Sequence, residues 1–297
     1  MHRYLKCIGF QAITTRKQLK GVFDTVLNQP DTVQYIPTEE EDNRLCVLTK
    51  NFAPGMGLAL CGNFNEDDDF ELEFYYPYFY SDVSSTFSPA TFERQGEKDS
   101  YMGSCDDYNV GITLIFYLSN FMDMRELTQE LGYPPAATSI RLTGLAEEGK
   151  VLLPIHKTID EEAAWKASKV KCDMVEAAKK GDRSAMEYLT RQEMRTFARV
   201  NREISTTDIY TLVNSFFMPN GVECDHYSIL GEIEDVKIIT NSLTGETVYR
   251  LLVDCNSIHL SVLIHQSDLF GMPQKGRRFK GKIWLQAFAD FESDSRY

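Results

Sequence analysis

The sequence has few of the residues that metal sites and disulfide scaffolds need. It holds five histidines and seven cysteines in 297 residues, and no Cys-x-x-Cys pair occurs. Without ligands paired at short spacing there is no structural zinc motif, and an odd cysteine count does not suit a fully disulfide-bonded framework. Several cysteines lie inside apolar or periodic segments, where a thiol behaves as a small hydrophobic side chain: Cys7, Cys46, Cys61, Cys172 and Cys255. We therefore predict free core cysteines, no metal and no cofactor.

Long hydrophobic runs are also missing. The longest, from Val110 to Leu118, is far shorter than the roughly 20 residues that cross a bilayer. Residues 1–7 lead straight into patterned structure, without the basic, apolar and small-residue regions of a signal peptide. We therefore expect a cytoplasmic protein that does not associate with membranes.

Positive charge is scarce in the N-terminal half. The formal net charge is -13, and residues 1–155 carry 12 basic and 23 acidic side chains, whereas residues 156–205 carry 11 and 9. An acidic surface repels phosphate backbones and anionic lipids, so this half is a poor candidate for binding either. A solvated acidic face that keeps the protein soluble is the simpler interpretation.

Hydrophobic periodicity predicts two similar units in the N-terminal half. The first has a strand over Leu5 to Ile13, a helix opened by Thr15 and ended near Pro30, and strands over residues 45–48, 57–60 and 70–80. The second has a strand over 110–117, a helix over 120–131 ended by Gly132, and strands over 139–145 and 150–155. This repeated order suggests an internal duplication.

Paired units of this kind are similar to the modules of the vicinal-oxygen-chelate (glyoxalase-like) superfamily, and Ile8-Gly9-Phe10 resembles the opening of one module. That resemblance implies a metalloenzyme with His and Glu ligands on facing strands. Only His2 and His156 lie near this region's ends, and its candidate acids have no imidazole partners: Glu71, Glu73, Glu93 and Glu97. The ligand set thus departs from the family's pattern.

Residues 74–80 form an aromatic run, Phe-Tyr-Tyr-Pro-Tyr-Phe-Tyr. Alternate strand residues point to opposite faces, so Tyr76, Tyr78 and Tyr80 share one face. We favour a strand buried on both faces by a helix and a partner sheet. The alternative is an exposed aromatic platform for a ligand or a protein.

Residues 93–107 are polar and contain acids and a thiol. Long ordered loops often carry function, so this segment supplies the catalytic candidates: Glu97, Cys105, Asp106 and Asp107. A solvated loop is the simpler interpretation.

The chain becomes helical in pattern from Ile159 to Ile204, with a join at Gly181-Asp182 where Asp182 is a plausible helix cap. A single such unit suits a hinge or an interdomain brace better than a solenoid. A basic stripe at helical spacing is more simply a solvated face: Arg191, Arg195, Arg199 and Arg202. A further helix is predicted over residues 207–217.

Strands predicted over 227–239, 247–254, 259–265 and 277–288 suggest a small open antiparallel barrel that is OB-like. Within the last lies a basic-aromatic cluster suited to phosphates and stacked bases: Lys275, Arg277, Arg278, Phe279, Lys280 and Trp284. Residues 227–297 carry 8 basic and 9 acidic side chains, whereas a nucleic-acid module is usually strongly basic. We prefer docking of this cluster on the acidic N-terminal half, in the same chain or another.

Over nearly its full length the chain resembles an uncharacterised family of cytoplasmic proteins from Gram-positive anaerobic bacteria, a domain of unknown function. Four segments carry the resemblance: His2 to Leu5, Ala177 to Asp182, Glu223 to Ile233 and Gly276 to Gln286. It implies a bacterial origin, and it supplies neither an activity nor catalytic residues.

Together these patterns predict an α+β protein with an acidic α+β domain (1–157), a helical connector (158–222) and a small β-barrel-like domain (223–297). No catalytic motif occurs, so the leading hypothesis is a non-enzymatic binding, adaptor or regulatory protein. Its partner would be an unknown protein or a second copy of the chain. Single-stranded nucleic-acid binding through the C-terminal cluster and glyoxalase-like metal chemistry are the alternatives.

Overall fold

The computed structural model describes residues 2–37, 44–65, 69–95, 100–107, 110–154, 170, 174–175, 177–178, 180–204 and 213–292, without the side chains of residues 193 and 195–204. The candidate acid Glu97, the histidine His156 and parts of the predicted connector lie outside these residues. Helices and strands are both present, which agrees with an α+β protein. None of the described helices combines the length and apolar character that crossing a bilayer requires.

The N-terminal part contains a four-stranded antiparallel sheet, in the order β1 (Thr32–Pro37), β2 (Arg44–Ala53), β3 (Met56–Phe64) and β4 (Phe70–Phe79). The predicted strands 45–48, 57–60 and 70–80 are thereby confirmed, whereas β1 was not anticipated. Helix α1 (Arg16–Asn28) begins, as predicted, with Thr15 as its cap in a capping box with Gln18.

The second half of β4 is covered on both faces, whereas residues 71–73 are exposed. On one face the Tyr75 ring lies 4.8 Å from the ring of Phe23 on α1, and on the other the Tyr76 ring lies 4.9 Å from that of Tyr117 in the second sheet. These contacts agree with the favoured interpretation of the aromatic run, a strand covered by a helix and a partner sheet, and Tyr80 at its end is 37% exposed.

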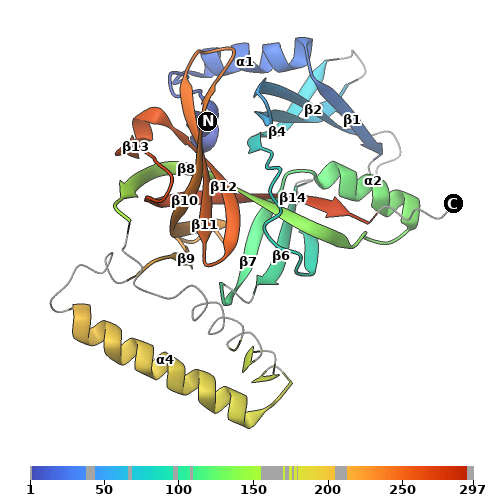
Figure 1. The fold of residues 1–297 in the computed structure, drawn as a ribbon. Helices are drawn as coiled ribbons and strands as arrows, with labels where there is room; N and C mark the ends of the chain where they lie inside the picture. Colours follow the sequence, from blue (N-terminus) through green and yellow to red (C-terminus); the bar gives the residue numbers. More distant parts are fainter. Residues whose placement is uncertain are drawn as a thin grey trace.

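The second sheet has ten strands: β5 (Ala90–Arg94), β6 (Tyr101–Asp107), β7 (Ile112–Leu118), β8 (Ala137–Leu152), β9 (Phe216–Pro219), β10 (His226–Thr240), β11 (Thr247–Cys255), β12 (Ile258–His265), β13 (Leu269–Phe270) and β14 (Arg278–Phe291). The four strands predicted in the C-terminal region correspond to β10, β11, β12 and β14. Figure 1 shows β8 from the N-terminal half running among these C-terminal strands.

Five strands of this sheet form a closed circuit, in which the last strand pairs with the first. Strand β8 pairs in parallel with β12, β12 with β11, β11 with β10, β10 with β14, and β14 pairs antiparallel with β8. Within this circuit β10 pairs with two strands: residues 226–232 pair with β14 and residues 232–240 pair with β11, and β9 pairs with residues 227–230 as well. Gly231 lies beside this change of partner, where an added Cβ would be 2.3 Å from the Asp254 carbonyl oxygen.

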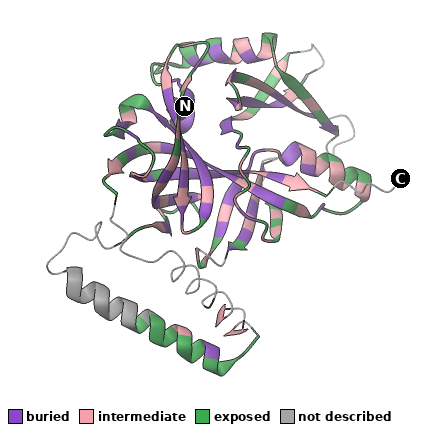
Figure 2. Ribbon diagram, viewed as in Figure 1, coloured by how far each residue is buried: buried purple, intermediate pink, exposed green. Residues whose placement is uncertain are grey.

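Strand β14 also joins the remaining part of the sheet. Gln286 and Ala287 pair with Tyr117 and Leu118 of β7, and β6 and β5 follow outward. A single hydrophobic cluster runs through both sheets, and Figure 2 shows the buried residues following the strands. The predicted boundary between residues 157 and 158 stays a prediction, and strands from both of its sides lie in one sheet.

Several predicted elements are wrong. Residues 5–8 belong to a 3₁₀ helix, η1 (Arg3–Ile8), that ends at Gly9 with φ +81°, in place of a strand. Neighbouring residues of η1 are buried without alternation, as Leu5, Cys7 and Ile8 show, and an apolar run of this kind does not distinguish helix from strand. The first unit therefore opens differently from the second, which weakens the case for a duplication.

The strands predicted over 139–145 and 150–155 are one strand, β8, which ends at Leu152. Gly149 lies within this strand, and the position requires glycine because a Cβ there would lie 2.4 Å from the Phe279 ring. The predicted loop over 93–107 contains the end of β5 and all of β6, and the predicted helix over 207–217 is wrong at its described end, where β9 begins.

Helix α2 (Phe121–Leu131) ends at Gly132 as predicted. Helix α4 (Arg183–Ile204) begins after Asp182, whose Oδ1 accepts a hydrogen bond from the Ser184 N–H at 2.8 Å, which confirms Asp182 as a cap. Figure 1 draws α4 to one side of the sheets, and most of its coloured residues in Figure 2 are exposed. Arg191, the described member of the predicted basic stripe, lies 3.7 Å from Glu187 on this surface.

Candidate functional site

The three predicted catalytic residues that the structure describes lie on β6. Cys105 is buried, and burial raises the pKa of its thiol to about 12, with Asp107 and Asp106 adding to the shift. A thiol that keeps its proton at neutral pH is a poor nucleophile. Asp106 accepts a hydrogen bond from Thr113 at 2.6 Å and Asp107 one from Thr86 at 2.9 Å. A catalytic role for these residues stays a prediction.

The predicted basic-aromatic cluster is divided between the core and the surface. Phe279 is fully buried, and Trp284, 6% exposed, donates its indole N–H to Asp225 at 2.6 Å. Arg278 is buried too and donates to the carbonyl oxygens of Leu153 and Val213 at 3.1 and 3.0 Å.

Of the other members of this cluster, Lys275 is exposed and Lys280 is partly buried. Arg277 donates to the Met272 carbonyl oxygen at 3.1 Å. Base stacking needs an accessible ring, and the rings of Phe279 and Trp284 are buried. Nucleic-acid binding therefore stays a prediction that neither ring supports. Docking on the N-terminal half agrees with the contact of Arg278 and with the Lys282–Glu148 ion pair at 2.8 Å.

The three alternate tyrosines of the aromatic run line one pocket. Tyr76 and Tyr78 are buried and Tyr80 is 37% exposed, and they border a cavity of about 340 Å³ between the small sheet, the start of α2 and β14. The lining residues are Thr32, Gln34, Val47, Thr49, Asn51, Gly55, Tyr76, Tyr78, Tyr80, Ser119, Asn120, Met122, Asp123 and Phe288. The tyrosines thus form an inner wall rather than an exposed platform.

The start of α2 is fixed to β14 by Asn120. Its Nδ2 donates to the Ala289 carbonyl oxygen at 2.9 Å and to Asp123 Oδ2 at 3.1 Å, while its Oδ1 accepts from the Ala289 N–H at 3.0 Å. Asp123, in the first turn, also accepts from Gln34 Nε2 of β1 at 2.9 Å. These contacts hold one carboxylate over the pocket, and the positive end of the helix dipole stabilises its charge.

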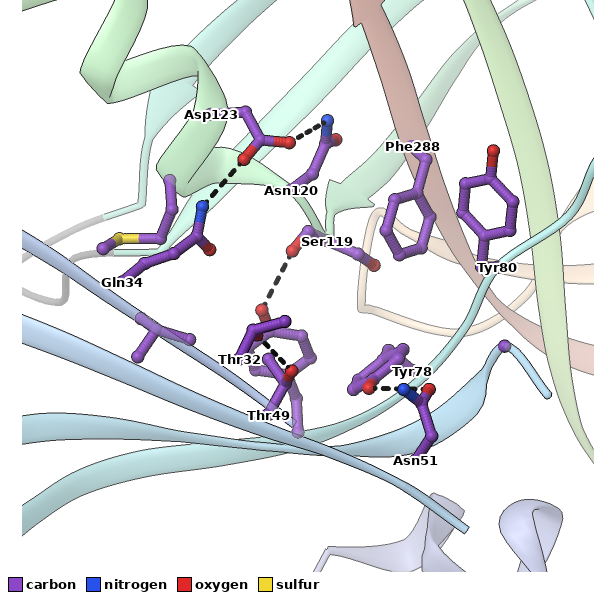
Figure 3. A pocket seen from close by; sticks show the side chains of 14 residues that line it. Thr32, Gln34, Thr49, Asn51, Tyr78, Tyr80, Ser119, Asn120, Asp123 and Phe288 are labelled. Atoms are coloured by element: carbon purple, nitrogen blue, oxygen red, sulfur yellow. Dashed lines mark hydrogen bonds between the residues drawn. The ribbon is translucent and has the colours of Figure 1, made fainter. Parts of the chain in front are cut away.

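The rest of the lining is neutral and rich in hydroxyl groups. Tyr76 donates to the Ser119 carbonyl oxygen at 2.9 Å, and Tyr78 donates to Asn51 Oδ1 at 3.1 Å. The Ser119 hydroxyl is buried without a hydrogen-bond partner among the described residues. A buried hydroxyl without a partner costs free energy. This oxygen is covered by neighbouring atoms and is not accessible from the cavity. Figure 3 shows these side chains around the cavity.

The charge of the lining comes from Asp123. No lysine, arginine or histidine is among the described lining residues. Burial raises the pKa of Tyr78 to about 12 and that of Tyr76 well above its ordinary value, so both phenols stay neutral. Arg141 contacts the wall from outside the lining: it lies 4.5 Å from the Tyr80 ring centroid and is ion-paired with Asp290. The pocket therefore carries one negative charge and four aromatic rings.

Comparison with known families matches residues 5–287 to a family described as a domain of unknown function, E. rectale gene description (DUF3881). The chain belongs to the DUF3881 family. This confirms the resemblance to an uncharacterised family, whereas similarity to the glyoxalase-like superfamily is not shown. The comparison with curated proteins finds no match, and the comparison with solved structures finds none either.

Metal binding, the chemistry that the glyoxalase-like pattern implied, has no assembled ligand set in the described part of the chain. No group of three or more His, Cys, Asp or Glu side chains there is placed to hold an ion. Glu71 and Glu73 instead accept hydrogen bonds from Asn65 and Asn63, at 3.3 and 2.9 Å.

Sequence reasoning found the tyrosines of the pocket and missed its polar side. Asp123, Gln34 and Phe288 come from α2, β1 and β14 and converge only in the fold. Asn120 was readable as a helix start, but its contacts with β14 depend on a strand more than 160 residues away in the sequence. No local motif marks a pocket that forms between two sheets.

Proposed function

We propose that this protein binds a small molecule without transforming it, and that the pocket between the small sheet and α2 is the site. The observation that carries the proposal is the convergence of Tyr76, Tyr78 and Tyr80 on one cavity whose polar rim comes from two other elements. Apolar and aromatic walls with a few fixed polar groups are typical of ligand sites. This specifies the binding role that the sequence suggested.

The chemistry of the lining supports binding rather than catalysis. Proton transfer needs a group that changes its protonation state near neutral pH, whereas the buried tyrosines Tyr76 and Tyr78 keep their protons. Asp123 is the one carboxylate among the described lining residues, and both of its oxygens accept hydrogen bonds from amides. The site thus offers ring surfaces and fixed hydrogen-bonding groups.

The size and charge of the pocket limit the ligand. A cavity of about 340 Å³ is at the small end of the range for ligand pockets, which suits a compact metabolite. An anion would meet the Asp123 carboxylate without a compensating cation in the described lining, so a neutral or positively charged ligand is favoured.

The fold around the site forms part of the proposal. We infer that the five-strand circuit of β8, β12, β11, β10 and β14 is the small OB-like barrel predicted for the C-terminal region, completed by β8; its closed pairing supports this. The cytoplasmic location is also proposed. The six described cysteines are free thiols, as expected in a reducing compartment.

The test is a saturation-transfer NMR screen of the full chain at pH 7 against neutral and cationic metabolite-sized compounds. For each binder, the affinity is then measured for Tyr80→Ala and Phe288→Ala, with Tyr133→Ala as the matched control. Tyr133 is exposed and lies outside the lining. We expect about tenfold weaker binding in the pocket variants, the loss of about 1.4 kcal/mol from one ring contact.

Tyr133→Ala is expected to bind like the unmodified protein. The proposal is wrong if no compound binds, or if binders keep their full affinity in both pocket variants.

A further inference from the structure

The pocket has two chemically different ends. Figure 3 shows Asp123 with Gln34 and Asn120 on one side, and Tyr78, Tyr80 and Phe288 on the other. The rings of Tyr80 and Phe288 lie 5.1 Å apart at 82°, and those of Tyr78 and Phe288 lie 6.5 Å apart at 66°. A ligand that spans the cavity meets a carboxylate at one end and aromatic surfaces at the other.

We propose that the ligand is a small organic cation, a protonated amine attached to a flat apolar body. This rests on the proposed function and specifies the class of molecule that the site takes. The ammonium group would lie at Asp123 and the body against Tyr78, Tyr80 and Phe288.

Asp123 can accept from an ammonium group in its present position. Its oxygens take one hydrogen bond each from Gln34 and Asn120, and a carboxylate has about four lone-pair sites. The two amides fix the carboxylate without neutralising it, so its negative charge stays within the lining. A bound ammonium group would balance that charge in a partly dry site, where charge-assisted hydrogen bonds are stronger than neutral ones.

The aromatic end of the pocket suits the flat apolar body of the ligand. Tyrosine and phenylalanine rings pack favourably against another flat apolar group, in offset-stacked or edge-to-face contact. Arg141 lies beside this end, 4.5 Å from the Tyr80 ring centroid. Because Arg141 pairs with Asp290, its charge does not offset that of Asp123.

Three probes of similar size and opposite or absent charge test the inference: 2-phenylethylamine, 2-phenylethanol and phenylacetate. Binding of each to the full chain is measured at pH 7 by ligand-detected NMR. We expect the amine to bind about tenfold more tightly than the alcohol, as one charge-assisted hydrogen bond implies. The carboxylate is expected to bind most weakly.

The charge at residue 123 is then removed with Asp123→Asn, and the exposed Asp24→Asn on α1 serves as the matched control. In Asp123→Asn the amine is expected to lose its advantage over the alcohol, while the alcohol still binds. Asp24→Asn is expected to keep the tenfold preference. If Asp123→Asn does not fold, the ¹³C chemical shift of the Asp123 carboxyl is measured in the unmodified protein with and without the amine. We expect this shift to change when the amine binds.

The inference is overturned if the alcohol or the carboxylate binds as well as the amine, if none of the three binds, or if the preference for the amine survives in Asp123→Asn. An unmoved Asp123 carboxyl signal under saturating amine also overturns it. Binding of neutral compounds alone in the wider screen would leave the proposed function standing without a cationic ligand, which separates the two failures.

Discussion

Trp284 donates its indole N–H to Oδ2 of Asp225 at 2.6 Å, and the other oxygen of Asp225 lies 2.7 Å from Nδ1 of His226. The rings of His2 and Tyr4 lie 5.0 and 5.3 Å from the indole ring. The Asp225 carboxylate thus connects the start of β10 to Trp284 of β14. His2 and Tyr4, from the other end of the chain, pack against the same indole ring and form one cluster with it.

Removal of this carboxylate should be costly. Asp225→Ala leaves the Trp284 N–H and the His226 ring without their partner in a largely buried site, and we expect a loss of about 2–3 kcal/mol in the free energy of unfolding, measured with urea. Trp284→Phe and the double variant complete a double-mutant cycle. A coupling energy of about 1 kcal/mol or more is expected; simple additivity of the two changes would contradict a direct interaction.

The same cluster should make stability depend on pH. Burial, followed by the charge of Arg3, lowers the pKa of His2 from 6.5 to about 4, so the folded protein favours the neutral ring. The unfolded chain takes up a proton near pH 6.5. The contribution of His2 is therefore fully present above pH 6.5 and is lost as the pH falls from 6.5 towards 4, to a maximum of about 3 kcal/mol.

The pH effect is checked by urea unfolding of the unmodified chain and His2→Phe at intervals between pH 7 and pH 4. We expect a shallower loss of stability in His2→Phe, which has no imidazole to protonate. His259→Phe is the control, because His259 is exposed beside Glu234 and not buried in the cluster. Equal slopes in all three proteins would exclude His2 as the source.

The sequence predicted those elements whose signals are local. Thr15 marks the start of α1 and Gly132 marks the end of α2, because capping depends on neighbouring residues. The alternation of Tyr76 and Tyr78 likewise identified a shared face. In each of these cases the physical cause lies within a few residues of its effect.

Elements whose conformation depends on distant partners were missed. Gly149 looks like a turn residue, yet the Phe279 ring fills the space a side chain would need and the strand continues. Residues 5–8 look like a strand because three of the four are apolar, and Leu5, Cys7 and Ile8 are buried in a segment that packs against β8 and β12. The polar side of the pocket was missed for the same reason, since Gln34 meets Asp123 only across two elements.

Two glycine substitutions should have opposite effects. Gly231→Ala places a Cβ 2.3 Å from the Asp254 carbonyl oxygen, a backbone atom that cannot move without disturbing the pairing of β10 with β11. We expect a loss of several kcal/mol, of the order seen for overpacked cores. Gly21→Ala in α1 has nothing within 4 Å and should stabilise by about 0.5–1 kcal/mol.

Thermal and urea unfolding of both glycine variants check this contrast. Since Gly21 has a helical position and open space, a loss of stability in Gly21→Ala would show that the α1 surface has contacts beyond those described. If Gly231→Ala left the stability unchanged, there would be more space around residue 231, where β10 passes from β14 to β11, than the strand pairings imply.

The strand circuit gives the predicted domain boundary at residues 222 and 223 a direct test. A fragment of residues 223–297 contains β10 to β14 but lacks β8, which pairs with β14 from Arg278 to Phe291 and with β12 from Ser261 to Ile264. Both strands would present unpaired backbone groups, and Ile283 and Leu285 of β14 would lose part of the core around them. We expect this fragment to be unfolded, with a poorly dispersed ¹⁵N–¹H spectrum.

A second fragment, in which residues 136–154 are joined by a glycine-serine linker to residues 213–292, restores β8 and should recover dispersed signals and cooperative unfolding. Dispersed signals from the 223–297 fragment alone would instead support an independent C-terminal domain, with β8 added to a sheet that is already stable.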